Sequence, residues 1–557
     1  ATMPVVVFDD KPFPTTKPKP APHGQHPIVH LVTTAEKELE ALRARQSKTL
    51  EEAVAEYRRR YGIPPPPNFD KWWKFAQSKN VQLIDEFDMI HEMLTPFWGM
   101  KPATIRARVR EILGYKDNQL IGVQIRGGNM SLVQGGFNWN QWLHPALRGM
   151  TQDFVQYLPD MDIAFNINDE PRVVVQHEDL ARLVETARNV AMPAANKTAT
   201  LRNAFTEHPD DLNYDDRFEE VKTTRFNTFS HQPVWVHSRM SCSPDSPARI
   251  IDETAQYDDE EKFLLGELGF VSNWTAMSDI CLSPSLRTRY GFFERPNSYT
   301  TAYDLVPIFS QSKISSYADI LYPSPWYWVD KVPYNEEKDL AWTDKRDALY
   351  WRGSTTGGFS RAGGWRRQHR QRVVRKINAH DNAFILAESK PGEWKTKEVP
   401  RQDYAQLMDV YFSHIGQCDP SDCDAQKAFF DVKEYAKQEE AFKYKHVLDM
   451  DGNAFSGRFY ALMRSRSLVY KWAIFREWHA EWLKPWAHFV PMSLRGDEWL
   501  ELVRFFGSGE SEEGLRMAEK IAMQGREWAE KVVRKEDMEV WFFRLLLEYV
   551  FPFPPPP

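Results

Sequence analysis

The apolar positions in the first part of the chain follow a helical spacing. Ala35, Leu39 and Leu42 would share the inner face of one helix. A second helix is predicted to begin at the capping box of residues 49–52 and to end at the prolines of residues 64–67. The helical pattern then resumes and continues to about residue 113, so the sequence predicts a helical N-terminal region.

After about residue 118, short apolar runs alternate with helix-like stretches. This alternation is typical of α/β units with parallel sheets. A polar stretch at about 193–262 predicts a loop-rich insertion, and the segment 510–549 is strongly helical. The predicted strands lie at residues 119–125, 163–167, 349–351, 447–450, 468–470 and 488–492.

The composition limits the class of protein. With 557 residues the chain is long enough for several domains, and 42% hydrophobic and 27% charged residues exclude wholesale disorder. A net charge of −7 argues against nucleic-acid binding through a broad basic field. The Pro- and Lys-rich residues 1–27 predict a flexible stem, and the start at Ala1 leads us to expect that a signal or membrane anchor preceded it.

The first candidate for chemistry is a turn that follows a predicted buried strand. Residues 161–167 lead into Asn168-Asp-Glu-Pro171. Ligands bind at the carboxyl ends of strands in parallel α/β sheets, so Asp169 and Glu170 are placed for a general base. The alternative is a turn aspartate that bonds to its own backbone.

A second candidate is the segment Ala348–Arg361, in which a short strand enters a loop rich in Gly, Ser and Thr. Glycines allow backbone N–H groups to approach an anion, and Ser354 and Thr355 add hydroxyl donors. Arg361 could bind a phosphate through two parallel hydrogen bonds. The loop matches neither common phosphate-binding fingerprint, and a plain surface loop is the alternative.

A third candidate lies in residues 445–471, which predict a strand, an Asp-Gly turn, a helix from Ser456 and a second strand. Arg458 falls in the first turn, where a cation opposes the helix dipole unless an anion is bound. We therefore interpret Arg458 as a phosphate ligand, with an exposed arginine as the alternative. Asp449 and Asp451 form an Asp-x-Asp pair of the type that holds divalent metals, but a strand Asp and an Asp-Gly turn explain it better.

Cysteines and sequons point to the secretory pathway. A local disulfide between Cys418 and Cys423 and a second between Cys242 and Cys281 are expected, although sequence does not determine connectivity. The N-x-[ST] sequons are at Asn129, Asn196 and Asn273.

The order and spacing of several short motifs resemble glycosyltransferase family 90 over roughly residues 28–548. The fungal capsule-associated proteins are the most similar group, and the animal protein O-glucosyltransferases are more distant. The motifs are Gln46–Val54, Tyr57–Gly62, Leu158–Asp162, Asn168–Pro171, Tyr317–Pro323, Trp351–Ser354, Phe455–Phe459 and Leu483–Trp486.

The resemblance implies a GT-B fold, in which two Rossmann-like domains face each other across the active site. The implied divisions are 1–27 (stem), 28–115 (helical region), 116–310 (acceptor and base domain), 311–509 (nucleotide-sugar domain) and 510–557 (C-terminal helix and tail). The catalytic base of the family falls on Asp169. The implied nucleotide-sugar ligands are Ser354, Arg361 and Arg458, with Arg352, Gly353 and Ser456 beside them.

The implied activity is inverting transfer of a sugar, xylose from UDP-xylose in the leading hypothesis, onto a mannose-containing glycan. The alternatives are a UDP-glucose-dependent enzyme and a non-catalytic, lectin-like pseudo-enzyme. GT-B transfer requires no cofactor, and Mn²⁺ or Mg²⁺ is the less favoured alternative. The expected location is the Golgi lumen, as a type II membrane protein with no nucleic-acid partner.

Overall fold

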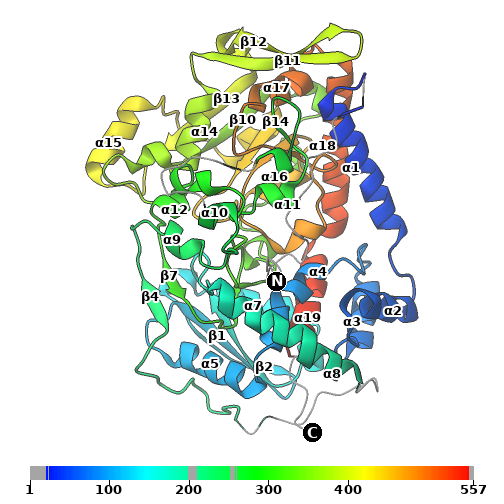
Figure 1. Cartoon of the computed structure of the whole chain (residues 1–557), viewed down its shortest axis with the longest axis vertical. Coiled ribbons are helices and arrows are strands. Elements are labelled where there is room, and N and C mark those ends of the chain that lie inside the picture. Colours follow the sequence, from blue (N-terminus) through cyan, green and yellow to red (C-terminus); the bar gives the residue numbers. More distant parts are fainter. Residues whose placement is uncertain are drawn as a thin grey trace.

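Two five-stranded sheets organise the chain in the computed structural model (Figure 1). The structure describes residues 21–22, 24–197, 209, 211–250, 258 and 260–550. Most of the predicted stem therefore lies outside the described residues. One sheet occupies the lower half of Figure 1 and the other the upper half. The fold is mixed α/β, as the alternating pattern predicts.

The N-terminal sheet has the strand order β2-β1-β3-β8-β9. Its first three strands are antiparallel neighbours, whereas β3, β8 and β9 are parallel. The expectation of a parallel sheet is thus wrong for half of this sheet. For β1 and β2 the reason is the two-residue turn at Gly127 and Gly128, whose φ values of 54° and 73° allow a tight hairpin. The strands are β1 (Leu120–Arg126), β2 (Asn129–Gly135), β3 (Met161–Asn166), β8 (Ile308–Ser310) and β9 (Ile320–Leu321).

The C-terminal sheet is parallel throughout, with the order β13-β10-β14-β15-β16. Its central strands are almost fully buried, which explains why they appear in the sequence as short continuous apolar runs. The predicted parallel α/β pattern is confirmed here. The strands are β10 (Arg346–Ser354), β13 (Met408–His414), β14 (Tyr444–Met450), β15 (Leu468–Trp472) and β16 (Val490–Pro491).

Helices at both ends of the chain connect the two halves. The predicted capping box is present at the start of α2, where Thr49 and Glu52 bond reciprocally. The predicted C-terminal helix is in fact two helices, α18 (Glu512–Val532) and α19 (Lys535–Val550). α19 returns to the N-terminal half, where the Nε1 of Trp72 donates to the Val540 carbonyl at 3.1 Å. The N-terminal helices are α1 (Pro27–Ala44), α2 (Leu50–Tyr61), α3 (Phe69–Ser78), α4 (Asp88–Trp98) and α5 (Pro102–Gly114).

Shorter elements fill the rest of the described chain. The predicted insertion is loop-rich in its described part, and a disulfide between Cys242 and Cys281 joins its end to the chain beyond. A second disulfide joins Cys418 to Cys423 at the start of α15. The remaining helices are α6 (Leu143–Thr151), α7 (His177–Thr186), α8 (Met192–Lys197), α9 (Trp235–Ser238), α10 (Pro247–Ile250), α11 (Trp274–Met277), α12 (Gly291–Glu294), α13 (Pro325–Trp328), α14 (His369–Ile377), α15 (Pro420–Phe429), α16 (Phe459–Arg464) and α17 (Trp499–Gly507). The remaining strands are β4 (Phe226–Thr228), β5 (Leu264–Leu265), β6 (Phe270–Val271), β7 (Thr300–Ala302), β11 (Asn382–Lys390) and β12 (Glu393–Pro400).

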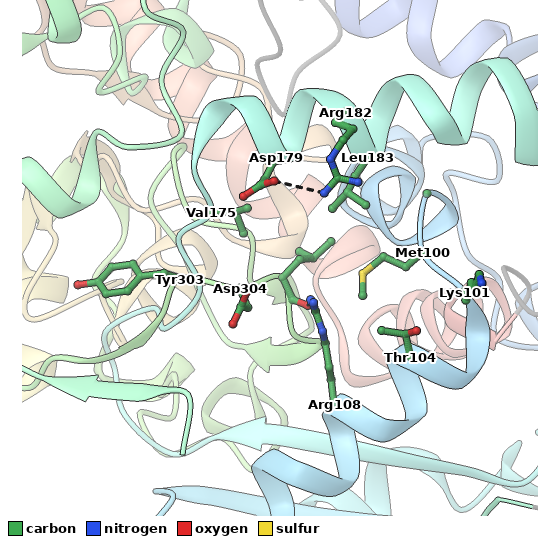
Figure 2. Close-up of a pocket in the computed structure, with 12 residues that line it drawn as sticks. Met100, Lys101, Thr104, Arg108, Val175, Asp179, Arg182, Leu183, Tyr303 and Asp304 are labelled. Atoms are coloured by element: carbon green, nitrogen blue, oxygen red, sulfur yellow. Dashed lines mark hydrogen bonds and ion pairs between the residues drawn. The ribbon is translucent and has the colours of Figure 1, made fainter. Parts of the chain in front are cut away.

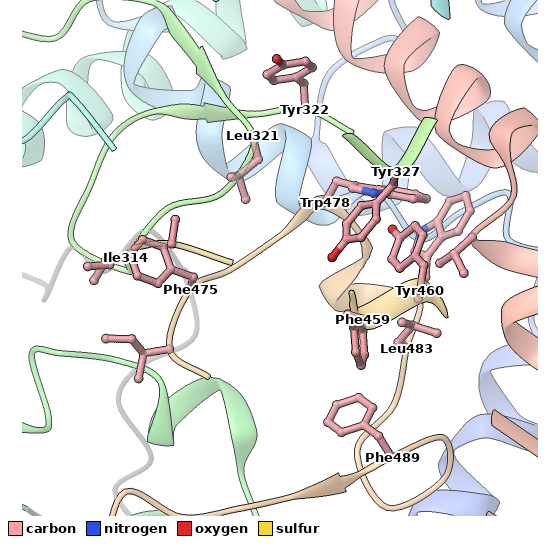
Figure 3. Close-up of a cluster of buried hydrophobic side chains, with 14 of the residues drawn as sticks. Ile314, Leu321, Tyr322, Tyr327, Phe459, Tyr460, Phe475, Trp478, Leu483 and Phe489 are labelled. Carbon is pink, nitrogen blue, oxygen red and sulfur yellow. The ribbon is translucent and has the colours of Figure 1, made fainter. Parts of the chain in front are cut away.

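A buried aromatic cluster joins the segment after β9 to the loop and helix that follow β14 (Figure 3). The ring of Tyr327 stacks on that of Tyr460, with centroids 3.7 Å apart. The Tyr327 hydroxyl donates to the carbonyl of Ser456 at 2.6 Å. This packing fixes the loop before α16, which carries the predicted phosphate ligand. Within the described ranges, no helix combines the length and apolar character that a membrane span requires.

Candidate active site

Three segments that the sequence singles out lie around one side chain, Asn453. The Oδ1 of Asn453 accepts a hydrogen bond from the backbone N–H of Gly357 at 3.0 Å. The same side chain lies near enough to Asp169 to oppose the rise that burial causes in the pKa of that carboxyl. The glycine-rich loop after β10 and the loop after β14 are therefore in direct contact, and the turn after β3 lies near them. All three lie at the carboxyl ends of their strands, where α/β sheets bind ligands.

The two neighbouring carboxyls of the first turn have different surroundings. Asp169 keeps an exposed surface, although the protein around it desolvates the carboxyl enough to raise its pKa. The nearby Asn453 side chain opposes this rise. Glu170 is 4% exposed, and its Oε1 accepts the backbone N–H of Ser298 at 2.9 Å. Burial and the nearby charge of Asp169 raise the pKa of Glu170. Of this pair, Asp169 is the carboxyl that an outside molecule can reach.

The backbone of this turn is held by buried polar side chains on both sides. Asn166, at the end of β3, donates from Nδ2 to the Glu170 carbonyl at 2.8 Å. Beyond the turn, the backbone N–H groups of Arg172 and Val173 each donate to the Asp319 carboxylate at 2.8 Å. These bonds fix where the Asp169 side chain emerges.

The glycine-rich loop after β10 is held close to its neighbours. Thr355 turns inward and donates to the carbonyl of Gly416 at 2.8 Å. Gly357 has a φ of +108°, and a Cβ there would lie 2.4 Å from the ring of His369. A glycine is therefore required at this position. Ser354, at the end of β10, is half-buried, and its hydroxyl lies 3.3 Å from that of Thr356.

Two arginines lie behind this loop. Arg458 is the N-cap of α16, which begins at Phe459, later than the predicted start at Ser456. Its Nη1 donates to the Arg352 carbonyl at 2.7 Å, and burial lowers its pKa. Arg370, on α14, was not among the predicted residues. Its Nη1 donates to the Ser354 carbonyl at 3.0 Å and to Thr356 at 2.6 Å.

The charges of these two arginines are poorly compensated. Burial, followed by the neighbouring charge of Arg458, lowers the pKa of Arg370 to about 10. Asp449 acts on Arg458 but pairs with Lys471 at 2.7 Å. Within the described residues, neither guanidinium has a carboxylate within ion-pair distance. Both make hydrogen bonds to neutral oxygens, but a cation that is buried or half-buried without a carboxylate partner is costly, so the arrangement favours an anion beside them.

The other predicted nucleotide-sugar ligands are already engaged with protein groups. Arg361 is exposed and forms a two-bond ion pair with Asp419, at 2.7 and 3.3 Å. Arg352 pairs with Asp409 at 2.5 Å. The remaining two are buried: Gly353 packs on the ring of Trp351, and Ser456 bonds to Tyr327 through its carbonyl. The structure thus places these residues near the loops but leaves their roles as ligands a prediction.

The Asp-x-Asp pair is built into the protein interior. One oxygen of Asp449 accepts from Lys471, and its other oxygen has no hydrogen-bond partner. Asp451 accepts from the Tyr290 hydroxyl and from the Ile474 N–H, each at 2.7 Å. Burial raises the pKa of Asp451 to about 6. In the part of the chain that the structure describes, no three His, Cys, Asp or Glu side chains are grouped as metal ligands would be.

A separate recess of about 270 Å³ lies between α5 and α7 (Figure 2). Arg108 and Thr104 from α5 lie opposite Asp179 and Arg182 from α7. None of the predicted catalytic or nucleotide-sugar residues lines it. This recess is therefore distinct from the Asp169–Asn453 region.

Sequence reasoning missed Asn453 and Arg370. Asn453 directly follows the Asp-Gly turn after β14, a position from which a side chain can face the ligand edge. Arg370 opens the sequence Arg370-Gln-Arg372 on α14, and nothing in the letters distinguishes the buried arginine from its neighbours. One weak signal for Arg370 was available in the sequence, namely its place at the start of a helix that follows a glycine-rich loop.

Comparison with known proteins gives one family. Residues 293–551 match the profile of the family described as Glycosyl transferase family 90. This region contains the two arginines, Ser354 and Asn453, while the turn with Asp169 precedes it.

The similar curated proteins are O-glucosyltransferases. O-glucosyltransferase rumi of Drosophila melanogaster is 25% identical over 268 residues, which are 44% of this chain and 54% of that protein. Protein O-glucosyltransferase 1 of Homo sapiens is 23% identical over 267 residues, 44% of this chain and 57% of that protein. Protein O-glucosyltransferase 3 of Mus musculus is 31% identical over 178 residues, 31% of this chain and 33% of that protein. The chain thus spans about half the length of the first two relatives, and it is the family profile that places residues 293–551 in glycosyltransferase family 90.

Proposed function

We propose that this protein is an inverting glycosyltransferase that uses a UDP-sugar and works in a GT-B-like arrangement of its two sheet-containing halves. The observation that carries the proposal is the contact made by Asn453. Asn453 accepts a hydrogen bond from the glycine-rich loop, behind which Arg370 and Arg458 lie, and its side chain is near enough to the exposed Asp169 to affect the pKa of that carboxyl. A base for the acceptor and cations for the leaving group are thus brought to one place.

In the proposed reaction, an acceptor hydroxyl attacks the anomeric carbon of the donor sugar. The bond from that carbon to the diphosphate oxygen breaks while the new glycosidic bond forms. The proton of the hydroxyl passes to the Asp169 carboxylate, and UDP leaves with both bonding electrons. Attack from the face opposite the diphosphate inverts the configuration and gives a β-glycoside.

The leaving diphosphate gains negative charge in the transition state. The Arg458 guanidinium and the backbone N–H groups of Thr356 and Gly358 are the proposed stabilising groups, since the N–H groups of Thr355 and Gly357 donate to His414 and Asn453. Arg370 contributes its charge from behind the loop while its N–H groups hold the Ser354 carbonyl and Thr356. These groups are held in place before the substrate arrives, so little reorganisation accompanies the reaction.

The leading donor hypothesis remains UDP-xylose with a mannose-containing acceptor, as the resemblance implies. UDP-glucose is the second candidate, because the similar curated proteins are named O-glucosyltransferases. A lectin-like protein without activity is the third. The exposed carboxyl of Asp169, together with Arg370 and Arg458, which form no ion pair among the described residues, supports an enzyme over it.

The test is UDP release from a panel of UDP-sugars, first without an acceptor and then with α-mannosides. We expect UDP-xylose to give the highest rate and the mannosides to increase it. Faster release from UDP-glucose would select the second hypothesis, and binding without release from any donor would select the third. The proposed reaction needs no metal, so EDTA should leave the rate unchanged.

The proposed location is the Golgi lumen, and the predicted sequons provide a check. Asn129 and Asn196 are exposed, whereas Asn273 is half-buried and its Oδ1 caps α11 by accepting the Ala276 N–H at 3.0 Å. We expect glycans at Asn129 and Asn196 and little or none at Asn273 in protein from a eukaryotic host. Glycopeptide mass spectrometry would show this, with Asn129→Gln as the control. Three unmodified sequons would contradict the proposed location.

A further inference from the structure

Two exposed aromatic rings lie side by side just after the edge strand of the N-terminal sheet. Trp139 is 68% exposed and Phe137 is 44% exposed. Their ring planes are 23° apart, and their centroids are separated by 6.2 Å. Both residues belong to the turn that follows β2. A contiguous apolar patch on a protein surface is a feature that binding sites share.

The backbone that carries the two rings is held by hydrogen bonds. The Oδ1 of Asn140 accepts the Phe137 N–H at 2.7 Å, and the Asn140 N–H donates to the Phe137 carbonyl at 3.0 Å. Gly136 has a φ of +78°, and a Cβ there would lie 2.7 Å from the Asn140 Oδ1. The His144 ring bonds to the Gly135 carbonyl at 2.9 Å. The rings are therefore presented by an ordered turn, so a ligand that stacks on them orders little of the protein.

The register of the sheet places this turn at the same edge as the turn with Asp169. Gly135 at the end of β2 and Phe165 near the end of β3 both pair with Ile121 of β1. Strands β2 and β3 therefore run in the same direction, and their carboxyl ends lie on either side of β1. Neighbouring strands are about 4.8 Å apart, so these two strand ends are about 10 Å apart. A short oligosaccharide can span such a separation.

Two half-buried tryptophans connect this turn to the donor loops. Trp142 follows Trp139 closely in the chain, and its ring meets the Trp326 ring edge-on, at a centroid distance of 6.2 Å. The Nε1 of Trp326 donates to the Gly457 carbonyl at 3.1 Å. Gly457 directly precedes Arg458, a proposed diphosphate ligand. The turn that carries the exposed pair is thus joined, through its own chain and these two tryptophans, to the loop that holds Arg458.

We propose that Trp139 and Phe137 form a binding surface for the acceptor glycan, on which one pyranose ring stacks its C–H face while another sugar presents its hydroxyl to Asp169. The inference rests on the proposed function, and it adds a place where the length of the acceptor is recognised. Stacking suits an uncharged sugar, because the two rings offer broad apolar faces. The exposed amides of Asn138 and Gln141, in the same turn, are neutral groups that can bond to hydroxyls.

A second protein chain is a poorer occupant of this surface than a sugar. A Phe or Trp side chain buries about 150–250 Å² when it is covered completely, and part of each ring is already covered by the chain itself. The pair therefore offers much less than the roughly 800 Å² that each partner contributes to a stable interface. An area of this size fits one or two sugar rings.

The test compares acceptors of two lengths. Trp139→Ala should raise the KM for an α-linked mannotriose about 10-fold, as expected for the loss of an aromatic contact, and should change the KM for methyl α-mannoside much less. Trp139→Phe keeps an aromatic face and should recover part of the loss. Phe384→Ala is the matched control, because Phe384 is 47% exposed on β11, at the opposite end of the molecule from β2 (Figure 1).

A role of the aromatic pair outside acceptor binding would give other results. An equal rise in KM for both acceptors, or no rise for the mannotriose, would overturn the inference. A change in sedimentation or in binding to phosphatidylcholine vesicles, without a change in KM, would also overturn it. Such a result would assign the pair to a second copy of the chain or to a membrane.

Saturation-transfer NMR with mannotriose and no donor gives a measurement that does not depend on transfer. The unchanged protein and Phe384→Ala should saturate the sugar protons, and Trp139→Ala should lose most of this signal. Binding that requires Trp139, in a protein that transfers no sugar, would support the inference and reject the proposed function. Active transfer with the same signal in Trp139→Ala would overturn the inference and leave the proposed function standing. Absence of a signal from the unchanged protein would overturn the inference as well.

Discussion

Asp169→Asn should lower the rate of sugar transfer by about 10²-fold or more, the low end of what general base catalysis contributes. The substitution keeps the size of the side chain but removes its ability to take the acceptor proton. UDP affinity should hardly change, because the proposed diphosphate ligands lie in the other half of the molecule. Transfer rates at saturating donor and calorimetry with UDP provide the two measurements.

Glu170→Gln is the matched control for this prediction. Glu170 is buried and uses Oε1 to accept the Ser298 N–H, a bond that the glutamine oxygen can retain. We therefore expect transfer and stability close to those of the unchanged protein. If Glu170→Gln were inactive and Asp169→Asn active, the base would be one residue away from our assignment. If both variants were active, the base would lie elsewhere.

The local elements were largely predictable, because their signals lie within a few neighbouring residues. The capping box at Thr49 and Glu52 marks the start of α2, and the apolar run at residues 447–450 falls in β14. The antiparallel part of the first sheet was missed although the Gly127-Gly128 pair is a hairpin signal. The alternating pattern further along the chain had suggested parallel strands throughout.

The site was predictable as three segments but not as a set of contacts. The residue pattern left Asp169 and Glu170 as alternatives, and only the family resemblance favoured Asp169. The physical difference between them, which the pattern could not give, is that the turn after β3 buries Glu170 and leaves Asp169 exposed. The sequence also could not show which arginine side chains contact the glycine-rich loop. Arg361 closes the loop in sequence but faces Asp419, while Arg370 reaches back from α14 to Ser354. Such choices depend on how distant elements pack.

Arg458→Ala should weaken UDP binding by about 1.5–3 kcal/mol, the range for hydrogen bonds to charged groups. This corresponds to roughly 10- to 150-fold in Kd. Arg458 is the better test than Arg370, because Arg370 also bonds to Thr356 and to the backbone around it. Isothermal calorimetry with UDP measures the change directly.

Arg361→Ala is the control for this second prediction, because its exposed guanidinium already pairs with Asp419. We expect its UDP affinity to be near that of the unchanged protein; a large loss would return Arg361 to the diphosphate site. Without ligand, Arg458→Ala should unfold at a similar or higher temperature, since it removes a half-buried charge that repels Arg370. The increase in Tm that UDP gives to the unchanged protein should shrink in this variant. A lower ligand-free Tm together with unchanged UDP affinity would instead show that Arg458 supports the fold through its bond to the Arg352 carbonyl.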